Sequence, residues 1–367
     1  MKSTQMQELI MSGINLKDGG TLNIYYDLLD ELIAKKVYEK YRITAFVNNT
    51  KQFSLYSDKV NLIELSPKNH VERLYYELIF FKKYSKKNKV AIWISMHDIT
   101  PNVVADKIYT YCQTAFPFMK IKLKYFKYTN MLFILAYKYI YLINKSKASA
   151  YIVQQTWMAN KLKKNLHINN IIVANPSIPA VGFKSNLNHN SDKKHDFTFI
   201  YPSLARFYKN YETVCEACHV LECRNVNDFK IIFTINGNEN KYTQMLKTRY
   251  GHLKNIAWLG CQPRQDLYEM MKESDCLLYT SELESWGLPI MEYKALEKPI
   301  IISNLPYAYE AVGCYERVKF VESDNIFELA DAMVQIIQGC IQFDLPKMVT
   351  SPFPYAKTWS ELIELIL

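Results

Sequence analysis

The stretch Glu284-Ser-Trp-Gly-Leu-Pro-Ile-Met-Glu292 decides the fold of this 367-residue chain. An apolar run at residues 276–280 precedes it and is typical of a buried strand, whereas residues 290–296 carry apolar side chains at helical spacing. A second apolar run, residues 300–302, follows. This succession of strand, loop, helix and strand predicts a βαβ unit, with Pro289 in the first helical turn, where its missing N–H costs no hydrogen bond.

The loop and helix start inside this segment favour an anionic ligand. The backbone N–H groups of Gly287 and Leu288 lie at the predicted helix start, where N–H groups lack partners within the helix and attract an anion such as a diphosphate. Glu284 precedes this site, and Glu292 lies one turn inside the helix. Because a carboxylate accepts strong hydrogen bonds from hydroxyl groups, two carboxylates around a diphosphate site predict a sugar nucleotide as ligand.

The segment resembles the E-x7-E motif of retaining glycosyltransferases of family 4. The resemblance runs in the family's order from Phe197 to roughly Gly339. It includes an opening strand with its loop, two further strands and a helix, at residues 197–203, 209–210, 231–237, 256–260 and 267–275. Because several spaced signals agree, the resemblance is more specific than E-x7-E alone.

The resemblance implies an α/β protein of the GT-B fold, in which two Rossmann-like domains face a central cleft. It also implies a retaining glycosyltransferase, specifically a hexosyltransferase, that binds its nucleotide-sugar donor in the cleft. For this family a front-face route is commonly proposed, in which the leaving phosphate helps to deprotonate the acceptor. Catalysis then depends on stabilising the departing diphosphate, not on a protein nucleophile.

The resemblance further implies roles for single residues. Glu284 would hold hydroxyls of the donor sugar, and Glu292 would hold the ribose diol. Lys209 would bind the diphosphate. Gly260 and Cys261 lie where the family reads the edge of the base.

Arg206 departs from the family pattern. The family places Gly-Arg directly after the strand, five residues before the lysine, where this chain has Ser203 and Leu204. Arg206 is only three residues before Lys209. A guanidinium binds phosphate in bidentate fashion, so we expect Arg206 to reach the same phosphate from a shifted position.

Charge divides the chain into two halves. Residues 1–183 hold 26 lysines and arginines against 12 acids, whereas residues 184–367 hold 19 against 24. The polar stretch 184–195 has the composition of a linker. We expect an N-terminal, acceptor-side domain over 1–183, a C-terminal nucleotide-sugar-binding domain over 196–350, and a C-terminal helix over 351–367, whose return toward the N-terminal domain is left open.

The N-terminal half also predicts alternating strands and helices. Residues 8–12, 43–47 and 90–95 are apolar runs typical of buried strands, and residues 22–41 show a helical pattern. The glycine pair that ends at Gly20 lies in the loop between the strand predicted over 8–12 and the helix predicted over 22–41. This pair either turns the loop or lets it approach a ligand, and the resemblance places the loop opposite the donor's phosphates.

His97 and Asp98 follow the strand predicted over 90–95, at the edge where open α/β sheets bind ligands. The resemblance places a histidine of this region beside the reacting sugar, with a buried structural histidine as the alternative. Asp98 could orient His97, act near the acceptor or cap the next helix. Capping is the default expectation for such an aspartate.

The segment 118–127 alternates lysines with apolar and aromatic residues, and it lies in a stretch, 107–191, that contains no acid. Lysines directed at headgroups, with rings at the interface, suit an anionic membrane surface. A plain solvated face and a nucleic-acid surface are the alternatives, but no nucleic-acid-binding module is legible. We expect membrane contact and no nucleic acid.

The start of the chain carries charged and amide side chains where a signal peptide has an apolar core, so a cytoplasmic protein is expected. The longest apolar run, residues 131–143, is interrupted by Lys138 and is too short to cross a bilayer. Eight cysteines in such a protein are expected to be reduced thiols.

Cys215-Glu-Ala-Cys218-His219 matches the spelling of a haem-attachment motif. However, Cys218 falls on the packing face of a predicted helix, and haem attachment requires export. Haem and zinc are therefore weak alternatives to buried helix thiols. No Asp-x-Asp or His/Cys ligand set stands at a strand end, so we expect no metal and no cofactor.

Together these features predict a glycosyltransferase that moves a hexose-type sugar from a nucleoside-diphosphate donor to a glycan acceptor. The acceptor is expected to be lipid-linked, the pathway to be surface polysaccharide biosynthesis, such as that of lipopolysaccharide, and the protein to be peripheral at the inner face of the cytoplasmic membrane. A catalytically silent sugar-nucleotide or lipid-binding partner protein is one alternative. A sugar-nucleotide epimerase is the other, which the spacing of Glu284 and Glu292 disfavours.

Overall fold

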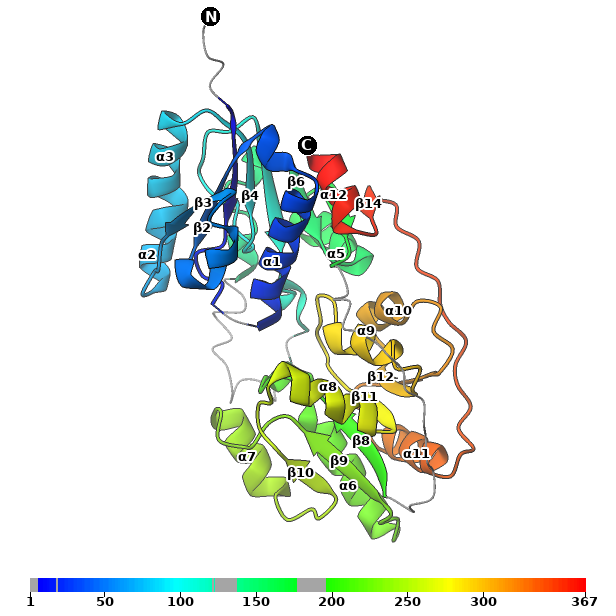
Figure 1. Cartoon of the computed structure of the whole chain (residues 1–367). Coiled ribbons are helices and arrows are strands. Elements are labelled where there is room, and N and C mark those ends of the chain that lie inside the picture. Colours follow the sequence, from blue (N-terminus) through cyan, green and yellow to red (C-terminus); the bar gives the residue numbers. More distant parts are fainter. Residues whose placement is uncertain (1–5, 18, 121, 123–136, 177–195) are drawn as a thin grey trace, which may run out of the picture. The chain divides into compact units, whose positions relative to one another are not determined.

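The computed structural model of the chain describes residues 6–17, 19–120, 122, 137–176 and 196–367. The described residues form two compact α/β units (Figure 1). Unit 1 draws on Met1–Phe118, Leu132–Ser177 and Thr350–Leu367, and unit 2 on Met119–Met131 and Ile178–Val349. The predicted linker, 184–195, lies outside the described residues.

Unit 1 is built on an eight-stranded sheet whose pairs are all parallel. Its strand order is β14-β7-β6-β5-β4-β1-β2-β3. The strands are β1 (Glu8–Ser12), β2 (Arg42–Val47), β3 (Val60–Glu64), β4 (Val90–Ser95), β5 (Lys107–Cys112), β6 (Ala150–Val153), β7 (Ile171–Ala174) and β14 (Tyr355–Ala356). The strands predicted over 8–12, 43–47 and 90–95 are confirmed.

Helices cover both faces of this sheet, as the buried residues of β1 show. Leu9 and Met11 belong to one core with α1 (Gly19–Ala34) and α12 (Trp359–Ile366), whereas Ile10 belongs to another with α3 (Phe81–Lys87). Side chains that alternate along a strand point to opposite faces, so one short apolar strand contributes to two cores. The other helical segments that the structure describes in unit 1 are η1 (Val37–Glu39), η2 (Thr50–Tyr56), α2 (His70–Tyr75), η3 (Tyr76–Phe80), η4 (Phe116–Phe118), η6 (Lys145–Lys147) and α5 (Thr156–Leu166).

The helix predicted over 22–41 is shorter and begins earlier. It starts at Gly19, whose φ is 71°, and ends at Ala34. The chain then takes a left-handed conformation at Lys36, with φ 54°, which a right-handed helix cannot contain. The predicted loop glycine Gly20 therefore lies in the first turn of α1, not in the loop.

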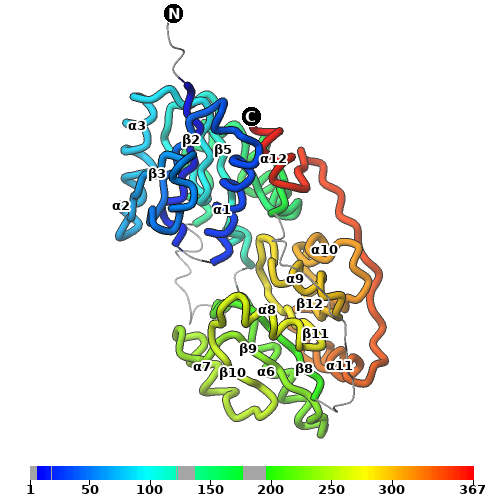
Figure 2. Tube along the Cα trace, in the orientation of Figure 1, coloured from blue at the N-terminus to red at the C-terminus, as the bar shows by residue number. Residues whose placement is uncertain are grey.

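The C-terminal segment belongs to unit 1. Strand β14 pairs with β7 at the edge of the sheet, and α12 packs beside α1. Figure 2 shows the red C-terminal trace next to the elements of the N-terminal region. Thr358 begins α12 by accepting a hydrogen bond from the backbone N–H of Glu361, 3.2 Å away.

Unit 2 contains a six-stranded parallel sheet of order β10-β9-β8-β11-β12-β13. Its strands are β8 (Phe197–Tyr201), β9 (Phe229–Phe233), β10 (Ile256–Trp258), β11 (Cys276–Tyr279), β12 (Ile300–Ser303) and β13 (Val318–Val321). Its helices are η7 (Phe207–Lys209), α6 (Tyr211–Cys223), α7 (Lys241–Tyr250), α8 (Arg264–Glu273), α9 (Leu288–Lys294), α10 (Pro306–Val312) and α11 (Ile326–Ile337). The βαβ unit predicted around the 284–292 segment is confirmed as β11, α9 and β12.

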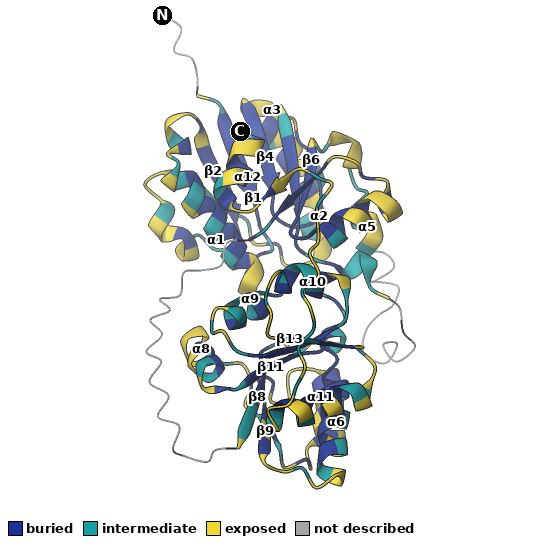
Figure 3. Cartoon of the chain, turned by 90° about the vertical axis from the view of Figure 1, so that its right-hand side faces the viewer, coloured by how far each residue is buried: buried dark blue, intermediate teal, exposed yellow. Residues whose placement is uncertain are grey.

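Figure 3 shows the strands of both sheets largely in the colour of buried residues and the outer sides of the helices in the colour of exposed ones. Among the described residues, no helix is long and apolar enough to cross a membrane.

Candidate functional site

Apart from Gly20, which lies in α1 of unit 1, the residues predicted to bind the donor gather at one edge of the unit 2 sheet. All strands of this sheet run in parallel, so the loops that follow β8 and β11 leave from the same edge. Within the sheet, β9 lies next to β8 on one side, and β11, which comes later in the chain, lies next to β8 on the other side. Such a reversal of strand order opens a crevice, where open α/β sheets bind ligands.

Hydrogen bonds join the two loops on either side of this crevice. The backbone N–H of Glu282 donates to the Tyr208 carbonyl at 2.8 Å, and the Thr280 hydroxyl donates to the Asn210 carbonyl at 3.1 Å. The Tyr307 hydroxyl supports the same loop by donating to the Ser281 carbonyl at 2.7 Å. These contacts fix the loop after β11 against the turn after β8.

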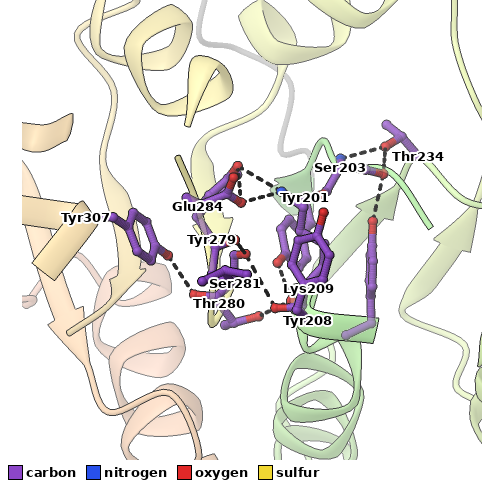
Figure 4. Close-up of polar contacts among 12 residues, drawn as sticks. Tyr201, Ser203, Tyr208, Lys209, Thr234, Tyr279, Thr280, Ser281, Glu284 and Tyr307 are labelled. Carbon is purple, nitrogen blue, oxygen red and sulfur yellow. Dashed lines mark hydrogen bonds and ion pairs between the residues drawn. The ribbon is translucent and has the colours of Figure 1, made fainter. Parts of the chain in front are cut away.

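The joined loops bring Glu284 and Lys209 into direct contact (Figure 4). The Lys209 ammonium forms an ion pair with Oε1 of Glu284, and the Tyr279 hydroxyl donates to the same oxygen at 2.8 Å. The two charged side chains are only about 10 % exposed. No described residue donates to Oε2 of Glu284, so the Lys209 and Tyr279 contacts hold one carboxylate oxygen only.

Aromatic rings surround the Lys209 ammonium. Its Nζ lies 5.4 Å from the centre of the Tyr279 ring and 5.7 Å from that of Tyr208. Burial raises the pKa of the Tyr279 hydroxyl well above its ordinary value, so this hydroxyl is protonated and donates to Glu284. The low polarity of such a site strengthens the interaction of Lys209 with an anion.

Glu292 lies on the outer side of α9, beside α8. It lines a pocket of about 350 Å³ with Arg264, Tyr268 and neighbouring residues of α8. The Arg264 guanidinium lies 3.5 Å from Oε1 of Glu292. Burial raises the pKa of the Glu292 carboxyl, and Arg264 opposes this rise.

Gly287 gives α9 its abrupt start. Its φ of 87° is a left-handed conformation, and a Cβ there would lie 2.7 Å from Cδ1 of Ile290. Glycine is therefore required by both backbone and packing. Leu288 is the first residue of α9, and Pro289 stands in its first turn, as predicted.

Gly260 and Cys261 follow β10 at the same edge of the sheet. Gly260 has φ 83°, and a Cβ there would lie 3.3 Å from the Asn236 side chain. The Cys261 thiol is exposed. Arg206, by contrast, precedes η7 on an exposed turn, and within the described ranges its guanidinium has no ion pair.

The unit 1 candidates lie at the corresponding reversal of strand order, between β1 and β4. His97 follows β4, as predicted, but its imidazole is buried within unit 1. Its Nε2 bonds the Glu77 carboxyl, and both side chains are at most 1 % exposed. Burial raises the pKa of Glu77 to about 8 and holds that of His97 well below its ordinary value, so a neutral, hydrogen-bonded pair results.

Asp98 does not cap a helix, so the default expectation for this residue is wrong. The next element in the chain is the strand β5. The Asp98 carboxylate instead accepts from the backbone N–H groups of Gln113 and Thr114, at 2.6 and 3.1 Å. It also accepts from the hydroxyls of Tyr137 and Tyr141, both at 3.0 Å. Asp98 thus organises the loop after β5 and is not hydrogen-bonded to His97.

Most of the lysine-rich segment 118–127 lies outside the described residues. Lys122 is described, and its ammonium lies 3.1 Å from Glu282 and 2.6 Å from Asp324. This lysine is therefore bound to acids of unit 2.

The expected buried thiols are confirmed for Cys215 and Cys218, whereas Cys223 is exposed. Across the described part of the chain, no group of three or more His, Cys, Asp or Glu side chains is arranged to hold a metal ion.

Three residues of these sites were not predicted from the sequence: Tyr279, Arg264 and Glu77. Tyr279 carried a usable signal, because a tyrosine at the end of a buried strand needs a partner for its hydroxyl. Glu77 carried another, because it is four residues before the apolar Phe81 and hence on the same helix face. Arg264 carried none.

A comparison with protein families identifies the C-terminal region. Residues 184–342 match the family described as Glycosyl transferases group 1. This match supports glycosyl transfer over the epimerase and the silent binding protein. No curated protein matches the chain.

Solved structures of the same fold cover nearly the whole chain. A glycosyltransferase from Rickettsia africae ESF-5 is 17 % identical with a TM-score of 0.64, over 91 % of this chain and 88 % of that one. WaaG, described as a glycosyltransferase involved in lipopolysaccharide biosynthesis, is 13 % identical with a TM-score of 0.63, over 90 % of both chains.

Anabaena Alr3699/HepE, solved with UDP and glucose, is 15 % identical with a TM-score of 0.56, over 92 % of this chain and 90 % of that one. The predicted GT-B fold, two Rossmann-like α/β units, is confirmed. The chain is thus a glycosyltransferase of GT-B fold, and its residues 184–342 are similar to the Glycosyl transferases group 1 family.

Proposed function

We propose that this glycosyltransferase moves a hexose from a nucleoside diphosphate to a lipid-linked glycan acceptor, with retention of anomeric configuration. The observation that carries the donor assignment is the contact between Lys209 and Glu284 at the reversal of strand order. A cation for the diphosphate and a carboxylate for sugar hydroxyls stand side by side there, and one carboxylate oxygen is left free.

The charged residues of the unit 2 site divide between the diphosphate, the sugar and the ribose of the donor. When the donor binds, the Lys209 ammonium leaves the Glu284 carboxylate and binds the diphosphate. Arg206 turns in from its exposed position to bind the same anion. Glu284 then accepts hydrogen bonds from hydroxyls of the donor sugar. Glu292 gives up its 3.5 Å contact with Arg264 and accepts hydrogen bonds from the two ribose hydroxyls. Gly287, Leu288, Gly260 and Cys261 supply backbone that approaches the donor closely.

The reaction breaks the bond between the anomeric carbon and the diphosphate oxygen, and it forms a bond from that carbon to the acceptor oxygen on the same face. The acceptor proton passes to an oxygen of the leaving diphosphate. Charge grows on the diphosphate as the bond breaks, so Lys209 stabilises the transition state more than the ground state. His97 is proposed beside the reacting sugar, with Gly20 near the phosphates; in the described conformation the imidazole is bonded to Glu77.

The acceptor and the location are proposed from chemistry and likeness. WaaG is described as involved in lipopolysaccharide biosynthesis, and the basic N-terminal half of this chain suits a membrane-bound, anionic acceptor. We place the enzyme at the inner face of the cytoplasmic membrane, in surface polysaccharide synthesis. It needs no metal and does not bind nucleic acid.

Incubation with a panel of UDP- and GDP-hexoses, with and without EDTA, tests this function. We expect slow release of nucleoside diphosphate from one donor, unaffected by EDTA, and by NMR the hexose of an α-linked donor should first appear as the free α-anomer. No release from any donor by folded protein would contradict the proposal. Loss of release in EDTA would contradict the metal-independent route alone.

A further inference from the structure

A continuous helical rod, residues 70–87, forms one outer side of unit 1. It consists of α2, η3 and α3 in succession, stacked end to end beside β2 and β3 in Figure 1. Its inner side packs Tyr76, Phe80, Phe81 and Tyr84 against the core that contains Phe46 and Trp93. The rod is thereby fixed to the sheet through aromatic side chains.

The outer side of the rod exposes a second apolar row. Val71 is 77 % exposed, Leu74 39 %, Tyr75 46 % and Ile79 46 %. These side chains recur at helical spacing, so they share one face of the rod. A fixed helix with apolar side chains on both its inner and its outer side indicates a surface that a partner covers.

Lysines continue the same face. Lys82, Lys83, Lys86, Lys87 and Lys89 are all exposed, and among the described residues none of them forms an ion pair. The rod has only two acids. Glu77 is buried against His97, and Glu72 is engaged at the helix start, where it accepts from the Lys68 N–H at 2.7 Å. The positive charge of this face is therefore not compensated by its own element.

We propose that this outer face, Val71 to Lys89, docks unit 1 onto an anionic lipid surface. Apolar and aromatic tips enter the boundary between headgroups and acyl chains, while the neighbouring lysines pair with lipid phosphates. Charge alone would suit a nucleic acid, but exposed aliphatic side chains gain nothing from a sugar-phosphate backbone. That the enzyme works at a membrane rests on the proposed function, because the lipid-linked acceptor lies there. The binding of this face to lipid is argued from its exposed side chains alone.

Vesicle sedimentation with three charge forms tests the lysines. The forms are wild type, the triple variant Lys82→Gln, Lys83→Gln, Lys86→Gln, and a control with Lys161→Gln, Lys163→Gln and Lys164→Gln. The control removes equal charge from α5 of the same unit, which has no exposed large apolar row. On vesicles of phosphatidylcholine and phosphatidylglycerol at low salt, the triple variant should bind about a hundredfold more weakly than wild type, and the control less than tenfold.

A second pair of variants tests the apolar row independently of charge. Val71→Ser with Ile79→Ser should weaken binding about tenfold or more, whereas Leu55→Ser with Leu365→Ser, also exposed in unit 1, should not. All four positions are exposed, so folding should be retained, as melting temperatures will verify.

Equal binding by the rod and control variants, or no binding of wild type to anionic vesicles at low salt, would overturn the proposal. Dissociation of a dimer by the apolar variant, without an effect on vesicle binding, would assign the face to a second copy of the chain and also overturn it. Diphosphate release from a soluble donor should be unchanged in every variant. If the wild type lacks this release but still binds vesicles through the rod, the proposed function fails and the lipid surface stands.

Discussion

Each unit pairs a carboxylate with a basic side chain at the reversal of strand order, but the two pairs differ in how accessible they are. In unit 2, Glu284 and Lys209 remain about 10 % exposed, and Oε2 of Glu284 accepts from no residue that the structure describes. In unit 1, Glu77 and His97 are at most 1 % exposed and neutral. A charged pair with access to solvent can exchange partners for a ligand, whereas a neutral pair in the core is closed to one.

The largest expected effect belongs to Glu284→Gln. This change keeps the volume of the side chain and removes the charge with which Glu284 is proposed to accept hydrogen bonds from sugar hydroxyls. We expect turnover to fall on the order of 10²-fold or more, with the melting temperature nearly unchanged. Glu269→Gln, in an exposed pair with Lys272, is the control. Near-normal turnover of folded Glu284→Gln would remove Glu284 from the donor site.

Binding of UDP and GDP separates the two members of the unit 2 pair. Lys209→Ala removes the charged hydrogen bond proposed to reach the diphosphate, so the dissociation constant of the nucleotide should rise roughly 10- to 100-fold. Glu284→Gln should leave it unchanged or lower it, because Lys209 is released from its ion pair. Calorimetric titration measures both. Equal weakening by the two variants would mean that their roles are wrongly divided.

The unit 1 pair predicts a dependence of stability on pH. Between pH 6.5 and about 8 the folded chain keeps a proton on Glu77 that the unfolded chain has lost, because the folded pKa of Glu77 is raised to about 8. The free energy of unfolding should therefore decrease by about 2 kcal/mol as the pH rises through this range. Below pH 6.5, His97 of the unfolded chain also binds a proton, which balances the proton on folded Glu77. The free energy of unfolding should therefore change little with pH there.

Urea unfolding of wild type and Glu77→Gln at several pH values checks this dependence. The variant has no carboxyl to titrate at this position. The difference in the free energy of unfolding between the two proteins should therefore change by about 2 kcal/mol between pH 6.5 and about 8. Parallel curves would indicate that Glu77 is ionised in the folded chain.

The smallest effect is expected for Tyr279→Phe, which deletes the hydroxyl that fixes Oε1 of Glu284. Loss of one hydrogen bond should lower kcat/KM for the donor by roughly 5- to 10-fold while the affinity for UDP stays the same. Tyr293→Phe is a matched control, because that buried hydroxyl bonds Ser274 at 3.0 Å. If both variants lose activity equally, Tyr279 contributes only to the core.

The unit 2 site could be predicted from the sequence because its key features are local. Glu284, Gly287 and Pro289 lie within six residues, and their order between two apolar runs indicates a strand, a tight loop and a helix start. The contact of Glu284 with Lys209 depends on two strands that are neighbours in space and 75 residues apart in sequence. Only the resemblance to a family, and not periodicity, placed Lys209 at this site.

Unit 1 was harder to predict for a related reason. The position of His97 after a strand was correct, but its burial depends on Glu77, which reaches it from a helix on one face of the sheet. Strand β3 has partly buried residues, and β6 and β7 are four residues long, so none has the long apolar pattern that made β4 recognisable.

The path of the chain through unit 1 has a consequence for biosynthesis. Strand β14 closes one edge of the eight-stranded sheet, and α12 covers α1, yet both follow the elements of unit 2 in the sequence. On the ribosome, unit 2 is therefore completed while unit 1 still lacks an edge strand and a helix. The first unit to be synthesised is the last to be finished, and its exposed apolar surface must be tolerated, or shielded by a chaperone, until Trp359 and its neighbours emerge.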